Sequence, residues 1–221
     1  MLNGLFTPST VGLKFAAILS TVLAVGTLAF SPAHAASLKT IVCFGDSLTA
    51  GYGLDDPDSQ AYPAQLQAKI KEAGVPYHVV NAGLSGETTA GGLRRVDWIL
   101  RQPVDVIVLA LGGNDGLRGI EPSVSAANLQ GIIDRVRTKN PTAKILLVGM
   151  MMPPSMGESY AKDFGAMYPA LAKKNKIEFV PFLLEGVGGH AELNQPDQIH
   201  PTAAGHAILA ETMWKALRPL L

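Results

Sequence analysis

Four short segments carry side chains that together could perform acyl transfer. Ser47 lies in a Gly-Asp-Ser-Leu-Thr segment, Asn114 follows two glycines, and Asp197 stands three residues before His200. A serine hydroxyl becomes a nucleophile when an imidazole takes its proton, and a neighbouring carboxylate fixes the tautomer of that imidazole. Asn114 offers an amide donor, and Gly83 allows a substrate oxygen to approach the backbone closely. The segments therefore supply a nucleophile, a base, an orienting acid and donors for an oxyanion.

Each of these segments is weak evidence when it is taken alone. A Gly-Asp-Ser tripeptide is most often an ordinary turn, and Asn-Asp after a pair of glycines is a common loop. The combination is informative because the first three segments follow successive predicted strands and the fourth precedes the last predicted helix. In open α/β sheets, ligands bind outside the carboxyl ends of the strands, and there these segments would meet.

The chain alternates apolar runs with helical segments in the order that a parallel sheet requires. Val104–Leu111 is the clearest strand, because it is apolar almost throughout, as central parallel strands are. The other predicted strands are Thr40–Phe44, Tyr77–Val80, Lys144–Met150 and Ile177–Leu183. The predicted helices are Tyr62–Ala73, Thr89–Leu100, Pro122–Thr138, Ser159–Lys174 and Thr202–Leu217. This pattern predicts a three-layer α/β/α domain with a five-stranded parallel sheet covered on both faces.

In this order, the four segments resemble the sequence blocks of the SGNH (GDSL) hydrolase family. The resemblance extends from Thr40 to about Leu220. Gly51-Tyr52-Gly53-Leu54, the segment Leu111–Gly119 and Ile199-His200-Pro201 are similar to the thioesterase, lysophospholipase and arylesterase members of that family. The resemblance implies a flavodoxin-like SGNH hydrolase fold and a serine hydrolase that cleaves carboxylic esters and thioesters.

The resemblance also implies a role for each matching residue. Ser47 attacks the acyl carbon, His200 takes its proton, and Asp197 holds His200. The backbone N–H groups of Ser47 and Gly83 and the side chain of Asn114 stabilise the oxyanion. An acyl-enzyme forms on Ser47, and water then releases the acid.

The substrate pocket is less clearly encoded than the triad. We expect Leu117, Met152 and Pro153 to contact the substrate. The loop Met150–Gly157 differs from what we expect of the thioesterase relatives. Its four methionines fit two interpretations equally, an adaptable filling of the core or a pliable apolar wall of the acyl pocket.

The first 35 residues are expected to be a cleaved signal peptide. An apolar run from Phe15 to Phe30 precedes Ala33-His34-Ala35, which has the small-x-small form that a signal peptidase cuts. A retained membrane anchor is the alternative, but the run is shorter than the roughly 20 residues that a span needs and is followed by Pro32. Cleavage would leave residues 36–221 as a single domain, in the periplasm or secreted.

Composition and charge exclude several classes of partner. The chain has 18 basic and 18 acidic residues, one of the basic residues being Lys14, so no basic surface is expected for nucleic acid or an anionic membrane. The single cysteine, Cys43, lies in an apolar run and is expected to be a buried thiol. No metal or cofactor is expected, because the histidines lack metal spacing and no phosphate-binding glycine motif occurs. We expect a monomer that acts on a small-molecule acyl ester or thioester.

Two other functions remain open on the sequence alone. One is a carbohydrate O-deacetylase of the same family, although the loop from Leu183 to Pro196 offers no aromatic platform for a sugar. The other is a non-catalytic flavodoxin-like binding module, which fits the sheet pattern but leaves the predicted triad without a purpose. Glu87 and Arg118 lie in loops on the side of the predicted site, and we interpret them as surface charges.

Overall fold

Five parallel strands form one sheet in the computed structural model, which describes Met1, Gly4 and residues 38–221. The expected signal peptide, residues 1–35, therefore lies outside the described residues apart from Met1 and Gly4. The strands are β1 (Lys39–Gly45), β2 (Tyr77–Gly83), β3 (Val106–Ala110), β4 (Lys144–Val148) and β5 (Glu178–Val180). They lie in the order β2-β1-β3-β4-β5, and every neighbouring pair is parallel. The sheet predicted from the apolar runs is confirmed.

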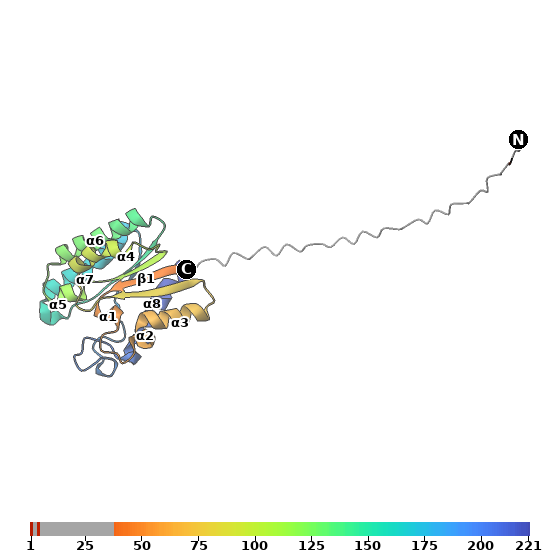
Figure 1. Cartoon of the computed structure of the whole chain (residues 1–221). Helices are drawn as coiled ribbons and strands as arrows, with labels where there is room; N and C mark the ends of the chain where they lie inside the picture. Colours follow the sequence, from red (N-terminus) through yellow and green to blue (C-terminus); the bar gives the residue numbers. More distant parts are fainter. Residues whose placement is uncertain (2–3, 5–37) are drawn as a thin grey trace. The chain divides into compact units, whose positions relative to one another are not determined.

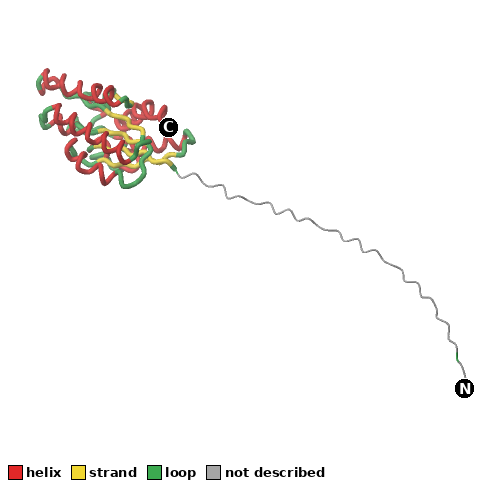
Figure 2. Tube along the Cα trace, turned by 90° about the horizontal axis from the view of Figure 1, so that it is seen from above, coloured by secondary structure: helices red, strands yellow, loops and turns green. Residues whose placement is uncertain are grey.

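Helices cover both faces of this sheet. They are α1 (Ser47–Ala50), α2 (Pro57–Gln60), α3 (Tyr62–Glu72), α4 (Thr89–Ile99), α5 (Gly113–Leu117), α6 (Pro122–Lys139), α7 (Glu158–Asn175) and α8 (Ala203–Leu217). Short 3-10 turns occupy Pro154–Met156, Ala191–Leu193 and Arg218–Leu220. On one face α3 packs against α8, and on the other α6 packs against α4 and α7 (Figure 1). Figure 2 shows from above how these helices flank the strands.

The two helical layers explain why the strands are so apolar. All five residues of β3 are buried, as are the residues of β1 from Ile41 to Gly45. Their side chains alternate between the two faces, and each face meets a helix. The fully buried Phe44 and Leu109 lie opposite each other in the β1–β3 register and belong to one continuous core.

The structure differs from the sequence prediction mainly at the ends of strands. The strand expected over Ile177–Leu183 ends at Val180, because Pro181 has no N–H to continue the ladder. Leu183 instead donates to the carbonyl of Gly149 at 3.0 Å. The one-turn helices α2 and α5 were not predicted, since a single turn is too short to show a helical period.

The strand order decides which loops meet. Strands β1 and β3 are neighbours, and Gly45 at the end of β1 pairs with Ala110 at the end of β3. The connections leave β1 and β3 in opposite directions along the sheet. Open α/β sheets bind ligands at such a point, outside the carboxyl ends of the strands. Ser47 and Asn114 follow these two strand ends directly. Within residues 38–221, no helix has the length and apolar character needed to cross a membrane.

Candidate active site

Ser47, His200 and Asp197 form one hydrogen-bonded chain. Nε2 of His200 lies 2.9 Å from Oγ of Ser47, and Nδ1 lies 2.6 Å from Oδ2 of Asp197. Ser47 and His200 are 153 residues apart in the sequence, so the fold alone brings them together. Geometry of this kind lets an imidazole accept the serine proton on one nitrogen while a carboxylate holds the other.

Ser47 is positioned by the first turn of α1. Asp46 is the N-cap of this helix, and its Oδ1 accepts the backbone N–H of Leu48 at 3.0 Å. Ser47 is therefore the first helical residue, and helical geometry gives its N–H no partner within the helix. Only 9% of Ser47 is accessible. The site thus presents a hydroxyl and an adjacent N–H from a largely covered position.

A tight turn before α8 orients the histidine. Oδ1 of Asp197 accepts the backbone N–H groups of Ile199 and His200 at 2.9 and 3.0 Å, which leaves Oδ2 for the imidazole. The pKa of Asp197 is lowered to about 2, chiefly by the backbone N–H of His200. Asp197 is therefore ionised throughout the neutral range, as an orienting acid must be.

Tyr52 also contacts the histidine, a role that its place in the sequence did not predict. Its ring centroid lies 4.7 Å from that of His200, with the ring planes tilted by 46°. Nε2 of Gln195 donates to the carbonyls of Tyr52 and Pro201 at 2.8 and 3.0 Å, so it ties the Tyr52 segment to the turn that carries His200. The only signal in the sequence was the Gly-Tyr-Gly-Leu segment noted for its family resemblance.

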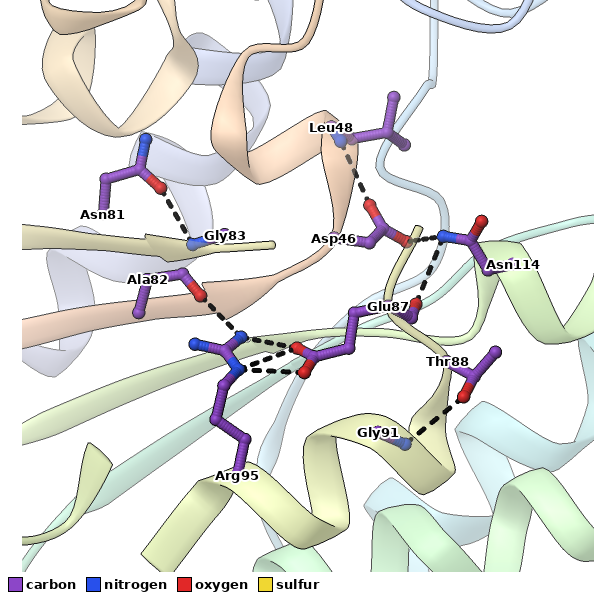
Figure 3. A network of polar contacts seen from close by, with 10 residues as sticks. All are labelled: Asp46, Leu48, Asn81, Ala82, Gly83, Glu87, Thr88, Gly91, Arg95 and Asn114. Carbon is purple, nitrogen blue, oxygen red and sulfur yellow. Dashed lines mark hydrogen bonds and ion pairs between the residues drawn. The ribbon is translucent and has the colours of Figure 1, made fainter. Parts of the chain in front are cut away.

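The amide of Asn114 reaches the same region from α5. Its Nδ2 donates to the backbone carbonyl of Glu87 at 3.2 Å and lies 3.4 Å from Oδ2 of Asp46 (Figure 3). Asp46 is almost fully buried, and this burial raises the pKa of its carboxyl to about 6. The structure therefore joins the segment after β3 to the Gly-Asp-Ser segment through Asn114.

The neighbouring residue, Asp115, anchors α5 from beneath. Its fully buried carboxylate accepts hydrogen bonds from the N–H and hydroxyl of Thr89, at 2.8 and 2.5 Å, and from the hydroxyl of Ser125 at 2.9 Å. Thr89 begins α4, and Ser125 belongs to α6. Because one buried carboxylate links three helices, the backbone that carries Asn114 has little freedom to shift.

Gly83 lies close to the site but faces a different neighbour from the one expected. A Cβ atom on Gly83 would come within 2.2 Å of the backbone nitrogen of Ala50, so a glycine is needed for the end of β2 to pack against α1. Its N–H donates to Oδ1 of Asn81 at 3.0 Å. The absence of a side chain at Gly83 therefore allows the end of β2 to pack closely against α1.

The interpretation of Glu87 as a surface charge is wrong. Glu87 is only 7% exposed, and its carboxylate binds the guanidinium of Arg95 on α4. A charge can be buried in this way because a bidentate partner compensates for the lost solvation. Arg118 is exposed, as expected, and donates to the carbonyl of Gly86 at 3.1 Å.

The three residues expected to contact substrate differ in their exposure. Leu117, at the end of α5, is 50% exposed, and Pro153 is also exposed. Met152 is only 8% exposed and packs against Gly116. In the Met-rich loop, Met151 is the methionine with an exposed side chain. Met152 therefore fills the core, as one interpretation of the loop requires, whereas the side chain of Met151 is exposed.

Comparisons with known proteins identify the family of this chain. Residues 43–208 match the GDSL-like Lipase/Acylhydrolase family. The chain is 42% identical to Esterase TesA of Pseudomonas aeruginosa over 84% of this chain and 91% of that protein. It is 38% identical to Thioesterase 1/protease 1/lysophospholipase L1 of Escherichia coli over 85% and 88%, and 36% identical to an Arylesterase of Vibrio mimicus over 82% and 88%.

Solved structures give the same result. The crystal structure of TesA superposes with a TM-score of 0.78 at 42% identity and covers 83% of this chain and all of that one. The SGNH-hydrolase family esterase AlinE4 superposes with a TM-score of 0.68 at 41% identity and covers 83% and 97%. The family resemblance and the SGNH fold expected from the sequence are confirmed. This chain belongs to the GDSL-like lipase/acylhydrolase family and is a carboxylic ester hydrolase of the SGNH type.

Proposed function

We propose that the protein hydrolyses carboxylic esters and thioesters through an acyl-enzyme formed on Ser47. The observation that carries the proposal is the continuous hydrogen-bonded chain from Oγ of Ser47 through His200 to Asp197, with distances of 2.9 and 2.6 Å. A serine at the start of a helix, bonded to an imidazole that is itself held by an ionised carboxylate, is the arrangement that acyl transfer requires.

The reaction proceeds in two halves. Oγ of Ser47 attacks the acyl carbon while its proton moves to Nε2 of His200, and the resulting imidazolium is stabilised by the Asp197 carboxylate. The tetrahedral intermediate collapses, and the leaving alcohol or thiol takes the proton from His200. A water molecule then attacks the acyl-serine ester, His200 accepts the water proton, and the acid leaves as the proton returns to Ser47.

The developing oxyanion is stabilised by donors from three segments. The N–H of Ser47 and the side-chain amide of Asn114 keep the roles expected from the sequence. For the third donor we propose the N–H of Gly86 in place of that of Gly83, because Gly83 donates to Asn81. Gly86 directly precedes Glu87, whose carbonyl accepts a hydrogen bond from Asn114. Such donors address the acyl carbonyl and not the leaving atom, which is why esters and thioesters are both expected to react.

The similar proteins support this substrate class. Their names describe an esterase, a thioesterase/lysophospholipase and an arylesterase, and each similarity extends over more than four-fifths of this chain. A carbohydrate deacetylase of the same family is the competing function. It would require strong selection for an acetyl group, which the rate series described below would reveal.

The proposal includes the place and form in which the enzyme works. We propose that residues 1–35 are a signal peptide, that residues 36–221 are the mature domain, and that this domain acts in the periplasm or outside the cell as a monomer. Mass spectrometry of the exported protein should give an amino terminus at Ala36, and light scattering should give the mass of one mature chain. An uncleaved membrane-bound form or a stable dimer would contradict these parts of the proposal.

The central test is turnover of nitrophenyl esters and acyl-CoA by the mature domain, with Ser47→Ala as the matched control. Both substrates should be hydrolysed, and the variant should lose on the order of 10⁴- to 10⁶-fold in kcat while its thermal unfolding stays unchanged. A serine-directed phosphonate should label the wild-type protein at Ser47 and leave the variant unlabelled. A folded variant that keeps more than a few per cent of the wild-type rate would exclude Ser47 as the nucleophile.

A further inference from the structure

A buried ion pair lies beneath the loop that contacts Asn114. Nε of Arg95 lies 2.9 and 3.1 Å from the two carboxylate oxygens of Glu87, and Nη2 lies 2.5 Å from one of them (Figure 3). The side chains of Glu87 and Arg95 are 3% and 21% exposed. A forked guanidinium and a carboxylate have few arrangements in which two nitrogens bond at once, so the pair fixes where Glu87 lies.

Arg95 is itself held by the sheet. Nη2 also donates to the carbonyl of Ala82 in β2 at 2.8 Å, and the guanidinium carbon lies 4.5 Å from the centre of the Phe44 ring in β1. Phe44 is fully buried, and a cation over an aromatic face is stabilised there. Arg95 therefore fixes the position of Glu87 relative to strands β1 and β2.

The backbone of Glu87 transmits this position to Asn114. Its carbonyl accepts one N–H of the Asn114 amide at 3.2 Å. An amide group is planar, so fixing the direction of one N–H also fixes the direction of the other. The same Nδ2 lies 3.4 Å from Oδ2 of Asp46, which is long for a hydrogen bond, so a substrate oxyanion could replace this weak acceptor without a turn of the amide.

We propose that Arg95 and Glu87 are positioning residues of the oxyanion hole. The pair holds the Glu87 carbonyl, and through it the Asn114 amide, in the orientation that stabilises the transition state. This inference rests on the proposed role of Asn114 as an oxyanion donor. Stability alone does not explain the pair, because apolar residues of similar size often replace a buried ion pair without loss of stability.

A double variant, Arg95→Met with Glu87→Met, separates positioning from stability. It removes both charges together and so leaves no unpaired charge in the interior. With a nitrophenyl ester, kcat should fall by roughly 10- to 100-fold and KM should change by less than about threefold, because a small misplacement of a donor affects the transition state more than substrate binding. Thermal unfolding would establish that the variant is folded.

The same change in an Asn114→Ala background gives the decisive comparison. Asn114→Ala alone should lower kcat by roughly 10² to 10³. If the ion pair acts through the Asn114 amide, adding the double substitution should lower kcat by less than about twofold further, because the donor to be positioned is already absent. If the double variant fails to fold, Arg95→Lys takes its place, alone and combined with Asn114→Ala. This substitution keeps the positive charge but loses the two-nitrogen contact of the guanidinium with Glu87.

Asp97→Asn provides a matched control on the same helix. Asp97 pairs with Arg135 and Lys139 at the surface, 3.3 and 3.0 Å away, and its loss should leave kcat unchanged. A wild-type kcat in the double variant, with Asn114→Ala strongly impaired, would overturn the inference and leave the proposed function standing. Fully additive losses would also overturn it. A wild-type rate for Asn114→Ala itself would remove both the inference and the proposed oxyanion donor.

Discussion

The ring of Tyr52 packs on the imidazole of His200, with centroids 4.7 Å apart, and this contact limits how the imidazole can turn. Tyr52→Ala should lower kcat by about tenfold, since aromatic pairs of this kind contribute about 0.5–1.5 kcal/mol. Tyr52→Phe keeps the ring and should stay within about twofold of the wild type. Steady-state kinetics on one ester would check both values. Equal losses in the two variants would assign the effect to the hydroxyl instead of the ring.

Asp197→Asn should lower kcat by about 10⁴ and leave the fold unchanged, because an amide in this position favours the wrong imidazole tautomer. Steady-state kinetics and thermal unfolding check the two parts of this prediction.

The wild-type rate should fall on acidification because His200 must be neutral to accept the Ser47 proton. With its pKa near 2, Asp197 itself stays ionised and does not contribute to that fall above about pH 4. A pH profile of kcat/KM checks this prediction, and a rate that does not fall on acidification would contradict it.

Two buried groups give the fold opposite responses to acid. Burial lowers the pKa of His206 from 6.5 to about 4, so its contribution to stability is present above pH 6.5 and is lost as the pH falls toward 4. Burial raises the pKa of Asp46 from 3.8 to about 6, so its contribution is fully present below pH 3.8 and is lost as the pH rises through 6. Each effect is on the order of 3 kcal/mol, and because their signs are opposite they partly offset each other.

Single variants should separate these two effects. His206→Gln keeps an acceptor for the N–H of Tyr62, which now bonds to Nδ1 of His206 at 3.2 Å. As the pH falls from 7 to 4.5, the free energy of unfolding of this variant should rise relative to that of the wild type. Over the same fall in pH, the free energy of unfolding of Asp46→Asn should decrease relative to that of the wild type. Urea unfolding at both pH values measures the differences, and parallel pH dependence in all three proteins would show that neither group titrates as described.

Substitutions of two methionines in the Met-rich loop should have different effects, one on stability and the other on substrate preference. Met152→Ala should lower the free energy of unfolding by about 2–5 kcal/mol, because Met152 is buried. Met151→Ala, at an exposed position, should leave stability within about 0.5 kcal/mol. Met151→Ala should lower kcat/KM for long acyl chains several-fold more than for acetate, since each buried methylene contributes about 0.8 kcal/mol. A uniform effect along the series from acetate to palmitate would mean that Met151 does not line the acyl site.

The same rate series tests the breadth of substrate preference in the wild type. The nucleophile lies at the rim of an open sheet beneath loops, so preference along the acyl chain should be graded, with short and medium esters favoured and long ones still cleaved. Triglyceride emulsions should be poor substrates. An abrupt hundredfold fall after nitrophenyl acetate would instead indicate a deacetylase.

The fold class and the chemical groups of the site could be predicted from the amino-acid sequence. The apolar runs mark the five strands because buried parallel strands exclude polar residues, and this constraint is local enough to read along the chain. The order of the four segments placed Ser47, Asn114 and His200 at one edge of the sheet. Strand ends and one-turn helices were harder to predict from the sequence, since they depend on single hydrogen bonds, such as that from Leu183 to Gly149.

The neighbours that each side chain contacts could not be predicted in this way, because they follow from the packing of distant segments. Nothing in the spacing of Glu87 and Arg95 distinguishes a buried pair from two surface charges, because their burial follows from the packing of α4 on β1 and β2. For the same reason, the sequence indicated that Gly83 is a point of close approach, but it could not show that α1 is the element that approaches it. Contacts between distant segments depend on the order of strands and the packing of layers, and these are properties of the whole chain rather than of any window within it.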